Sequence, residues 1–267
     1  MASGSSVRPV ETLRELVTSL EAALTVVAAK PKPKPVHHLR TITRRIEAQI
    51  ELLAMLSGAE KKRKATEEPV ELLGKLRKAA GRVRDIDVQR KLIKSGTGSQ
   101  SKEARQLRKI LKQHRHKEEA RLLNTLEEHR SKLAKALEVL VEAKEAAKPA
   151  PFAVAKLADL VCDWYTHNSP AVSQSAEQMH EIRKAAKMSR YMAESISEDS
   201  KLAQIFEEIQ QAGGRWHDWL MLNQIACEEL GDSSTLAKLF AQRCERSMAE
   251  YKRYLKSLPQ KLAHVTG

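Results

Sequence analysis

The chain has 267 residues, enough for one large or two small domains with an ample hydrophobic core. Aromatic residues make up only 4% of it and only 10 residues are glycine, so the composition favours helices and leaves little material for a β-sheet. Lys and Arg number 47 against 34 acidic residues, and the formal charge of +13 should raise the affinity and the association rate for any polyanion.

Hydrophobic spacing predicts four helices in the first half of the chain, at about 10–29, 36–57, 70–95 and 99–147. The segment KPKPKP at 30–35 separates the first two as a short extended linker, because proline interrupts helices. A polar loop is expected at 57–69, and the third helix should end at SGTGS. Within the long fourth helix, His129–Ser131 is a candidate break.

The segment KPAPF at 148–152 is the predicted boundary between two halves of the chain. Beyond it, helices are expected at about 152–168, 174–197, 201–230 and 233–257. The sequence therefore predicts one all-α domain over 1–267, with halves at about 10–148 and 152–258 and flexible tails at 1–9 and 259–267.

A basic helix occurs twice, as VHHLRTITRR at 36–45 and as MHEIRKAAKMSRY at 179–191. The repeated positions are His37, Arg40 and Arg44 in the first copy and His180, Arg183 and Lys187 in the second. Residues at this spacing share one helical face, while Leu39, Ile42 and Ile46 fall on the opposite face. Two such helices predict one polyanion site built from two halves.

A second element repeats downstream of each basic helix. It consists of Gly81, Arg84 and Asp85 in the first half and of Gly214, His217 and Asp218 in the second. Chance similarity between amphipathic helices is the alternative, but the same order of elements in both halves favours an internal repeat. The glycines are expected to permit close helix approach. The aspartates could form a carboxylate pair for metal or acid–base chemistry, but we interpret them as groups that orient a neighbouring Arg or His.

These motifs resemble the CHAD family, whose name stands for conserved-histidine α-helical domain, from about Val10 to Leu258. The resemblance implies two pseudo-symmetric four-helix bundles in one compact domain with a basic groove or pore. It also implies binding of inorganic polyphosphate. The chain departs from the family pattern at Glu47, where a further basic residue is common, and at the core positions Ile209 and Trp216. The first departure weakens one edge of the expected site.

Further cations extend the predicted polyphosphate site. On the fourth helix, a face with few acidic residues nearby carries Arg105, Arg108, Lys109, Lys112, Arg115 and His116. The alternative interpretation is a solvated surface. Arg45 and Arg190 extend the two stripes, Arg246 is the expected partner on the last helix, and Tyr191 supports the second stripe. Arg supplies a planar fork for two phosphate oxygens, Lys a mobile charge, and His near phosphates favours its protonated form.

Two other functions stay open. Nucleic acid would also attract a basic helical protein, but Trp216 and Trp219 belong to the apolar pattern, which argues against base stacking and for weaker nucleic-acid binding. A phosphohydrolase is less favoured, because neither an E-x-E-x-K strand nor a G-x-x-x-x-G-K-S/T loop occurs. The sequence contains no H-x-x-x-H pair, so a metal site is not expected. We therefore expect a non-enzymatic binding module without a cofactor.

The expected compartment is intracellular. Cys162, Cys227 and Cys244 lack C-x-x-C spacing and fit buried free thiols, and no apolar run is long enough to span a membrane. KKRK at 61–64 has the form of a nuclear import signal, with a plain basic loop or an extra polyphosphate contact as the alternatives. Without nuclear import, the cytoplasm or polyphosphate granules are expected. The oligomeric state is left open.

Overall fold

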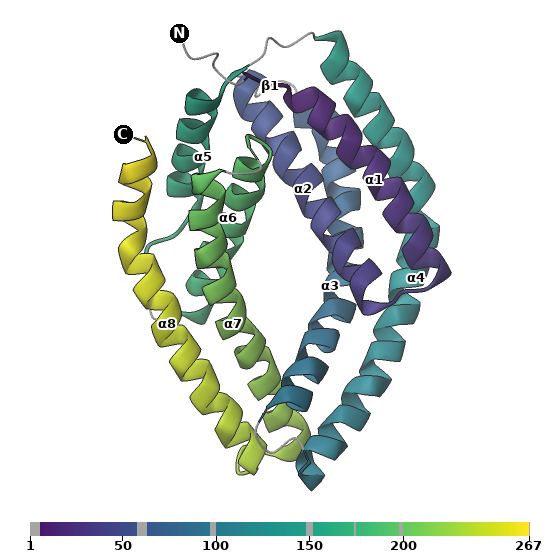
Figure 1. Ribbon diagram of the computed structural model, residues 1–267. Coiled ribbons are helices and arrows are strands. Elements are labelled where there is room, and N and C mark those ends of the chain that lie inside the picture. Colours follow the sequence, from purple (N-terminus) through teal and green to yellow (C-terminus); the bar gives the residue numbers. More distant parts are fainter. Residues whose placement is uncertain are drawn as a thin grey trace.

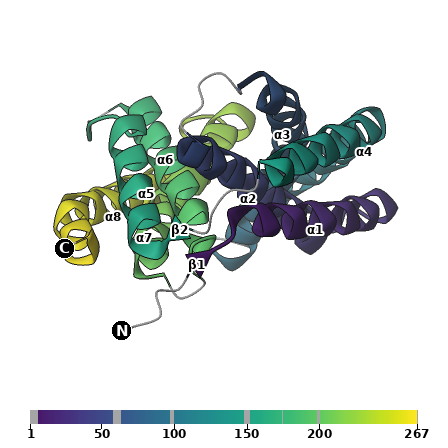
Figure 2. The same ribbon diagram turned by 90° about the horizontal axis from the view of Figure 1, so that it is seen from above.

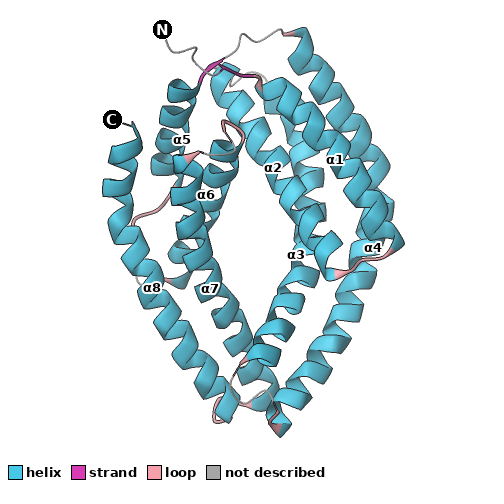
Figure 3. Cartoon of the chain, viewed as in Figure 1, coloured by secondary structure: helices cyan, strands magenta, loops and turns pink. Residues whose placement is uncertain are grey.

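The computed structural model describes residues 6–57, 63–96, 100–147, 152–173, 175–197 and 200–266. Within them the chain forms eight helices and one short pair of strands, which confirms the expected all-α class (Figure 3). The helices are α1 (Pro9–Ala29), α2 (Pro33–Ser57), α3 (Arg63–Ser95), α4 (Lys102–Ala146), α5 (Val154–Asn168), α6 (Ala176–Glu194), α7 (Lys201–Leu230) and α8 (Thr235–Thr266). The strands β1 (Ser6–Val7) and β2 (Phe152–Ala153) pair antiparallel.

The helices form two groups. In the first group, α1 and α3 each contact both α2 and α4, and in the second group, α5 and α7 each contact both α6 and α8. The two groups lie close together at both ends of the molecule, and their ribbons lie farther apart in the middle (Figure 1). Seen from above, α8 and α4 lie on opposite sides (Figure 2). The predicted pseudo-symmetry that relates the groups stays a prediction.

Each group has its own apolar core, and the groups also share apolar contacts at two places. On one side, Ala48 and Leu52 of α2 belong to the core of the second group, because α2 packs against α6. At the other end, a third cluster combines residues from α3, α4, α7 and α8, including Ile93, Leu107, Leu222 and Phe240. These two contacts hold α2 and α3 opposite α6 and α7.

Serine caps explain where several helices begin. Ser101, Ser175 and Ser200 each accept the backbone N–H of the residue three positions further on, at the starts of α4, α6 and α7. At the end of α7, Gly231 has a φ of 86°, a conformation that glycine adopts most readily. Polar breaks of this kind are why α7 has the predicted bounds of Lys201–Leu230.

Two helices begin earlier than predicted. α2 starts at Pro33, inside the predicted KPKPKP linker, because a proline in the first turn lacks only an N–H that would have no helical partner. α3 starts at Arg63, inside the predicted loop, and continues through Pro69. An ion pair of 2.9 Å between Lys132 and Glu68 ties its start to α4. The KKRK motif falls on residues whose side chains lie outside the described part of the chain.

Two helices continue further than predicted. α4 has no break at His129–Ser131, because Leu126 and Leu133 carry its buried stripe through this segment. α8 passes Pro259 and reaches Thr266, because Leu262 and Val265 pack against the core of the second group. Residues 259–266 are therefore helical where a tail was predicted, and at the other end Ser6 pairs with β2. Residues 148–151 of the predicted boundary lie outside the described residues.

The length and hydrophobicity of the helices bear on whether any of them could span a membrane. In the described part of the chain, none is both long and apolar enough to cross a membrane. The three cysteines are free, as predicted, but they are only partly buried. Burial still raises the pKa of Cys162 to about 11, which keeps this thiol protonated.

Candidate functional site

Charged and histidine side chains from four helices meet where the two groups face each other. We call this set the central cluster: His37, Arg40 and Arg44 of α2, Arg84 and Asp85 of α3, His180, Arg183 and Lys187 of α6, and His217 and Asp218 of α7. Apart from burial, the charge of Arg40 does most to lower the pKa of both Arg183 and Lys187. The fold therefore brings the two predicted stripes together.

Core packing on one side of each helix holds the stripes in place. On α2, Leu39 and Ile46 are completely buried, and Arg40 and Arg44 project from the other side of the same turns. A Cβ atom at Gly81 would lie 3.4 Å from Nε of Arg40, which is an ordinary van der Waals contact, so α3 lies close to this arginine but the predicted need for glycine stays a prediction. The corresponding prediction for Gly214 was wrong, because a Cβ atom there would meet nothing within 4 Å.

The close approach in the second half occurs one residue earlier. A Cβ atom at Gly213 would lie 2.8 Å from the ring of Tyr251 and 3.0 Å from Cγ of Arg183. Tyr251 is completely buried and donates a hydrogen bond of 3.3 Å to the backbone oxygen of Met179. Gly213 thus leaves room beside α7 for both the ring of Tyr251 and the aliphatic part of Arg183.

Histidines form the edge of the central cluster in both halves. Nε of Arg84 donates to Nδ1 of His37 at 3.4 Å, and Nη2 of Arg183 lies 3.4 Å from Nδ1 of His180. The rings of His180 and His217 are 4.8 Å apart. Arg84 and His217 occupy matching positions of the two repeats, so in each half the histidine of the stripe faces the residue before the repeated aspartate.

The ionisation of the cluster is unfavourable for its cations. Burial, together with Arg40, Arg183 and Arg44, lowers the pKa of Lys187 well below its usual value. Burial and the neighbouring Arg183 lower the pKa of His217 to about 3. Burial and the like charge of Asp85 raise the pKa of Asp218 to about 6. Cations are held here with little water around them, and an anion between the helices would relieve this cost.

Unpartnered donors point to the same conclusion. Among the described residues, Nε of Arg40, of Arg44 and of Arg183 are buried and have no hydrogen-bond partner. A buried donor without a partner is expensive in a folded protein, and such a group calls for a specific explanation. Here the two stripes present three of these donors, from α2 and α6, to one place.

Glu47, the departure from the family pattern, has a structural role beside the cluster. It lies 3.0 Å from Nη1 of Arg44 and 2.9 Å from Nε of Arg77 and is itself buried. The pKa of Arg44 falls to about 10, chiefly because of burial, and Glu47 opposes that fall. Part of the charge of Arg44 is thus compensated within the protein.

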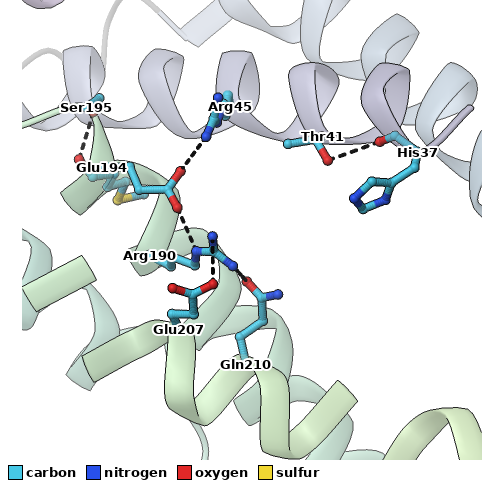
Figure 4. Close-up of polar contacts among 9 residues, drawn as sticks. His37, Thr41, Arg45, Arg190, Glu194, Ser195, Glu207 and Gln210 are labelled. Carbon is cyan, nitrogen blue, oxygen red and sulfur yellow. Dashed lines mark hydrogen bonds and ion pairs between the residues drawn. The ribbon is translucent and has the colours of Figure 1, made fainter. Parts of the chain in front are cut away.

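Arg45 and Arg190 differ from their neighbours on the stripes, because both bind carboxylates (Figure 4). Nη2 of Arg45 lies 3.0 Å from Glu194, and Nε of Arg190 lies 2.6 Å from the other oxygen of the same carboxylate. Arg190 also contacts Glu207 at 3.1 Å and Gln210 at 3.2 Å. Arg45 thus joins α2 to α6, and Arg190 joins α6 to α7. The buried ring of Tyr191 lies 5.9 Å from Nζ of Lys187 and supports that charge.

The predicted face of α4 is only partly available to a ligand. Arg115 is partly buried and belongs to a network, with Nε at 2.8 Å from Asp87, an ion pair with Glu119 and a hydrogen bond of 2.7 Å to the oxygen of Pro31. Arg115 is paired although few acidic residues lie near this face in the sequence, because Asp87 comes from a different helix. The exposed members are Arg105, Lys109, Lys112 and His116, and Arg108 lies beside α3. Arg246 is exposed on α8.

Arg84 and His217 belong to the cluster although they were absent from the predicted contacts. The signal for them was present in the sequence, because each stands directly before a repeated aspartate. Asp85 and Asp218 both raise the pKa of Arg183, so they lie close enough to hold this guanidinium by charge, as interpreted from the sequence.

The fold and the cluster define an all-α protein with two helix groups that face each other across a set of cations. The CHAD domain family matches residues 11–227, so the chain belongs to this family. The crystal structure of the CHAD domain from the plant Ricinus communis is similar, with a TM-score of 0.66 and 15% identity over 98% of this chain and 94% of that one. PptA from Streptomyces chartreusis is similar with a TM-score of 0.51 and 17% identity over 98% and 99% of the two chains. At these identities the likeness establishes the CHAD-type fold alone. No curated protein matches the sequence.

Proposed function

We propose that this chain binds inorganic polyphosphate in the central cluster and catalyses no reaction on it. The observation that carries the proposal is the set of buried Nε donors of Arg40, Arg44 and Arg183, which have no partner among the described residues. Phosphate oxygens are strong acceptors for guanidinium groups and carry the charge that the cluster lacks.

A linear chain of phosphates suits the arrangement better than a single phosphate. The cations come from α2, α3 and α6, which belong to both groups, and each phosphate bound by Lys or Arg adds its own electrostatic contribution. In this proposal Arg40, Arg183 and Lys187 bind the polyphosphate. Asp85 and Asp218 hold Arg183 in position, and the three histidines become additional donors once phosphate raises their pKa values.

Nucleic acid is the second candidate, and the aromatic residues argue against it. Trp216 is 2% exposed and stacks on Tyr251 with ring centres 6.0 Å apart. A buried tryptophan is unavailable for stacking on bases, which is how single strands are usually bound. The charges of duplex DNA lie on a stiff helix that does not fit between α2 and α6.

Titration calorimetry at fixed salt tests the proposal with long-chain polyphosphate, tripolyphosphate and phosphate. We expect affinity to rise steeply with chain length and to fall linearly on a log–log plot against salt, with a slope of several units. Equal affinity for phosphate and long-chain polyphosphate would contradict a site with many contacts. Displacement of polyphosphate by single-stranded DNA at equal phosphate concentration would favour the second candidate.

A further inference from the structure

A second basic surface lies outside the central cluster. A hollow of about 510 Å³, which we call the α3–α4 hollow, is lined by Pro33, Lys34, His37, Arg84, Asp87, Arg90, Lys91, Lys94 and Arg108. Six of these residues are Lys or Arg, and Asp87 is the one carboxylate among the described residues of its lining. The start of α2, the last turns of α3 and the first turns of α4 supply them.

The negative charge of Asp87 is compensated by Arg115, which does not line the hollow. Its Oδ1 atom lies 2.8 Å from Nε of Arg115, which is 12% exposed. Asp87 therefore contributes little net negative charge to the hollow. On α3, Arg84, Lys91 and Lys94 share one face, and Arg90 and Lys94 are separated by four residues, a spacing at which like charges destabilise a helix.

The α3–α4 hollow is continuous with the central cluster. His37 and Arg84 belong to both, and Nε of Arg84 donates to Nδ1 of His37 at 3.4 Å. A flexible polyanion bound between the stripes can therefore pass these two residues and continue along α3 without leaving cationic surface.

The cations that α3 contributes to the hollow have no charged counterparts at the matching positions of the second half. Counted from the repeated aspartates, the positions of Arg90, Lys91 and Lys94 are taken by Asn223, Gln224 and Cys227 on α7. Asn223 instead donates a hydrogen bond of 2.8 Å to the backbone oxygen of Ala237 and so joins α7 to α8. The repeated stripes are thus extended by cations at one end only.

We propose that the α3–α4 hollow is a second anion-binding site that holds the phosphate groups of a polyphosphate chain beyond those in the central cluster. The inference rests on the proposed function. It makes the site one-sided: chains long enough to pass His37 and Arg84 gain contacts with Arg90, Lys91 and Lys94, and chains confined to the central cluster do not.

Binding of two ligands by matched variants tests this proposal. The first variant combines Arg90→Gln, Lys91→Gln and Lys94→Gln. The control combines Lys156→Gln, Arg253→Gln and Lys256→Gln, which are exposed on α5 and α8, on the far side of the molecule from α3 (Figures 1 and 2). For the hollow variant, we expect about tenfold or greater loss of affinity for long-chain polyphosphate and a salt slope lower by about two to three units. Its affinity for tripolyphosphate should stay within about twofold of wild type, and the control should stay within about threefold for both ligands.

Each contrary outcome overturns a different statement. Equal losses in the hollow variant and the control, or equal losses for tripolyphosphate and the long chain, would overturn the second site while leaving the central cluster intact. A loss seen with single-stranded DNA but not with polyphosphate would assign the hollow to nucleic acid. Absence of polyphosphate binding by the wild-type chain would overturn the proposed function itself. Circular dichroism monitors folding, and the milder pair Lys34→Gln and Lys94→Gln, both exposed, replaces the triple variant if it fails to fold.

Discussion

Two sets of cations on the same two helices differ in what surrounds them. Arg45 and Arg190 both reach Glu194, which joins α2 to α6. Arg40 lies less than two helical turns from Arg45, and Arg183 lies less than two turns from Arg190. Each nevertheless keeps a buried Nε that has no partner in the described part of the chain. The comparison shows that a basic stripe divides according to where acids lie on neighbouring helices: one part forms ion pairs that link helices, and the other keeps buried donors without an acceptor.

Reversing the charge of the unpartnered set should have the largest effect. Arg40→Glu with Arg183→Glu adds carboxylates beside Asp85 and Asp218, and removes two charged hydrogen bonds worth roughly 1.5–3 kcal/mol each. We expect at least about a hundredfold loss of polyphosphate affinity in titration calorimetry. The control is Arg253→Glu with Lys256→Glu, two exposed cations of α8. Similar losses in both variants would mean that net charge alone attracts the ligand.

Removing the buried charge of Lys187 should separate stability from binding. Lys187→Met keeps the side-chain volume and relieves repulsion by Arg40 and Arg183. Replacement of a poorly solvated charge by an apolar group of similar volume removes the cost of burying that charge. Thermal unfolding without ligand should therefore show a higher Tm, whereas polyphosphate affinity should fall. A lower Tm would mean that Lys187 has a stabilising role in the unliganded chain.

Breaking the partnered set should have the reverse result. Glu194→Gln leaves Arg190 partly buried with fewer acceptors and should destabilise the fold by about 1–3 kcal/mol. Affinity for polyphosphate should stay within about threefold of wild type. Urea unfolding and calorimetry on the same variant measure both quantities. A large loss of affinity without a change in stability would place Glu194 in the binding site and contradict the division described above.

Acid should tighten binding, although it weakens the unliganded fold at His217. The folded pKa of His217 is about 3, below its ordinary value of 6.5, so protonation of this residue opposes folding as pH falls from about 6.5 to about 3. Asp218 acts in the opposite sense, because its raised pKa gives a contribution to stability that is present below 3.8 and lost as pH rises through about 6.

Bound phosphate favours both the charged histidine and the neutral aspartic acid. Between pH 7.5 and pH 5.5 we therefore expect polyphosphate affinity to rise about three- to tenfold, with uptake of protons. Calorimetry in two buffers of different ionisation enthalpy measures that uptake. The double variant His217→Gln and Asp218→Asn should flatten the pH dependence, and an unchanged slope in this variant would exclude both groups as its source.

Much of the fold and half of the site could be predicted from the sequence. Periodicity reveals which face of a helix is apolar, so α7 and the stripes of α2 and α6 were predicted correctly. It does not reveal which helix lies opposite. Arg45 and Glu194 are 149 residues apart, and Asp87 reaches Arg115 from another helix, so their pairing could not be predicted.

The position of the crowded glycine and the end of α8 depend on contacts with other helices, which the sequence alone does not reveal. Gly213 rather than Gly214 allows the close approach, because the position of Tyr251 on α8 decides which glycine is crowded. The extension of α8 past Pro259 depends on a core that accepts Leu262 and Val265. Arg84 and His217, in contrast, were within reach, since matching positions of a repeat are expected to share a role.

Histidine NMR signals test most directly whether polyphosphate occupies the central cluster. The chain has nine histidines, of which His37, His180 and His217 belong to the cluster, while His167 and His264 lie exposed on α5 and α8. On titration with polyphosphate at constant pH, we predict that the imidazole signals of His37, His180 and His217 move and that the pKa values of these three rise, while the signals of His167 and His264 keep their positions. Equal movement of His167 and His264, or no change at His180 and His217, would contradict a site between the two stripes.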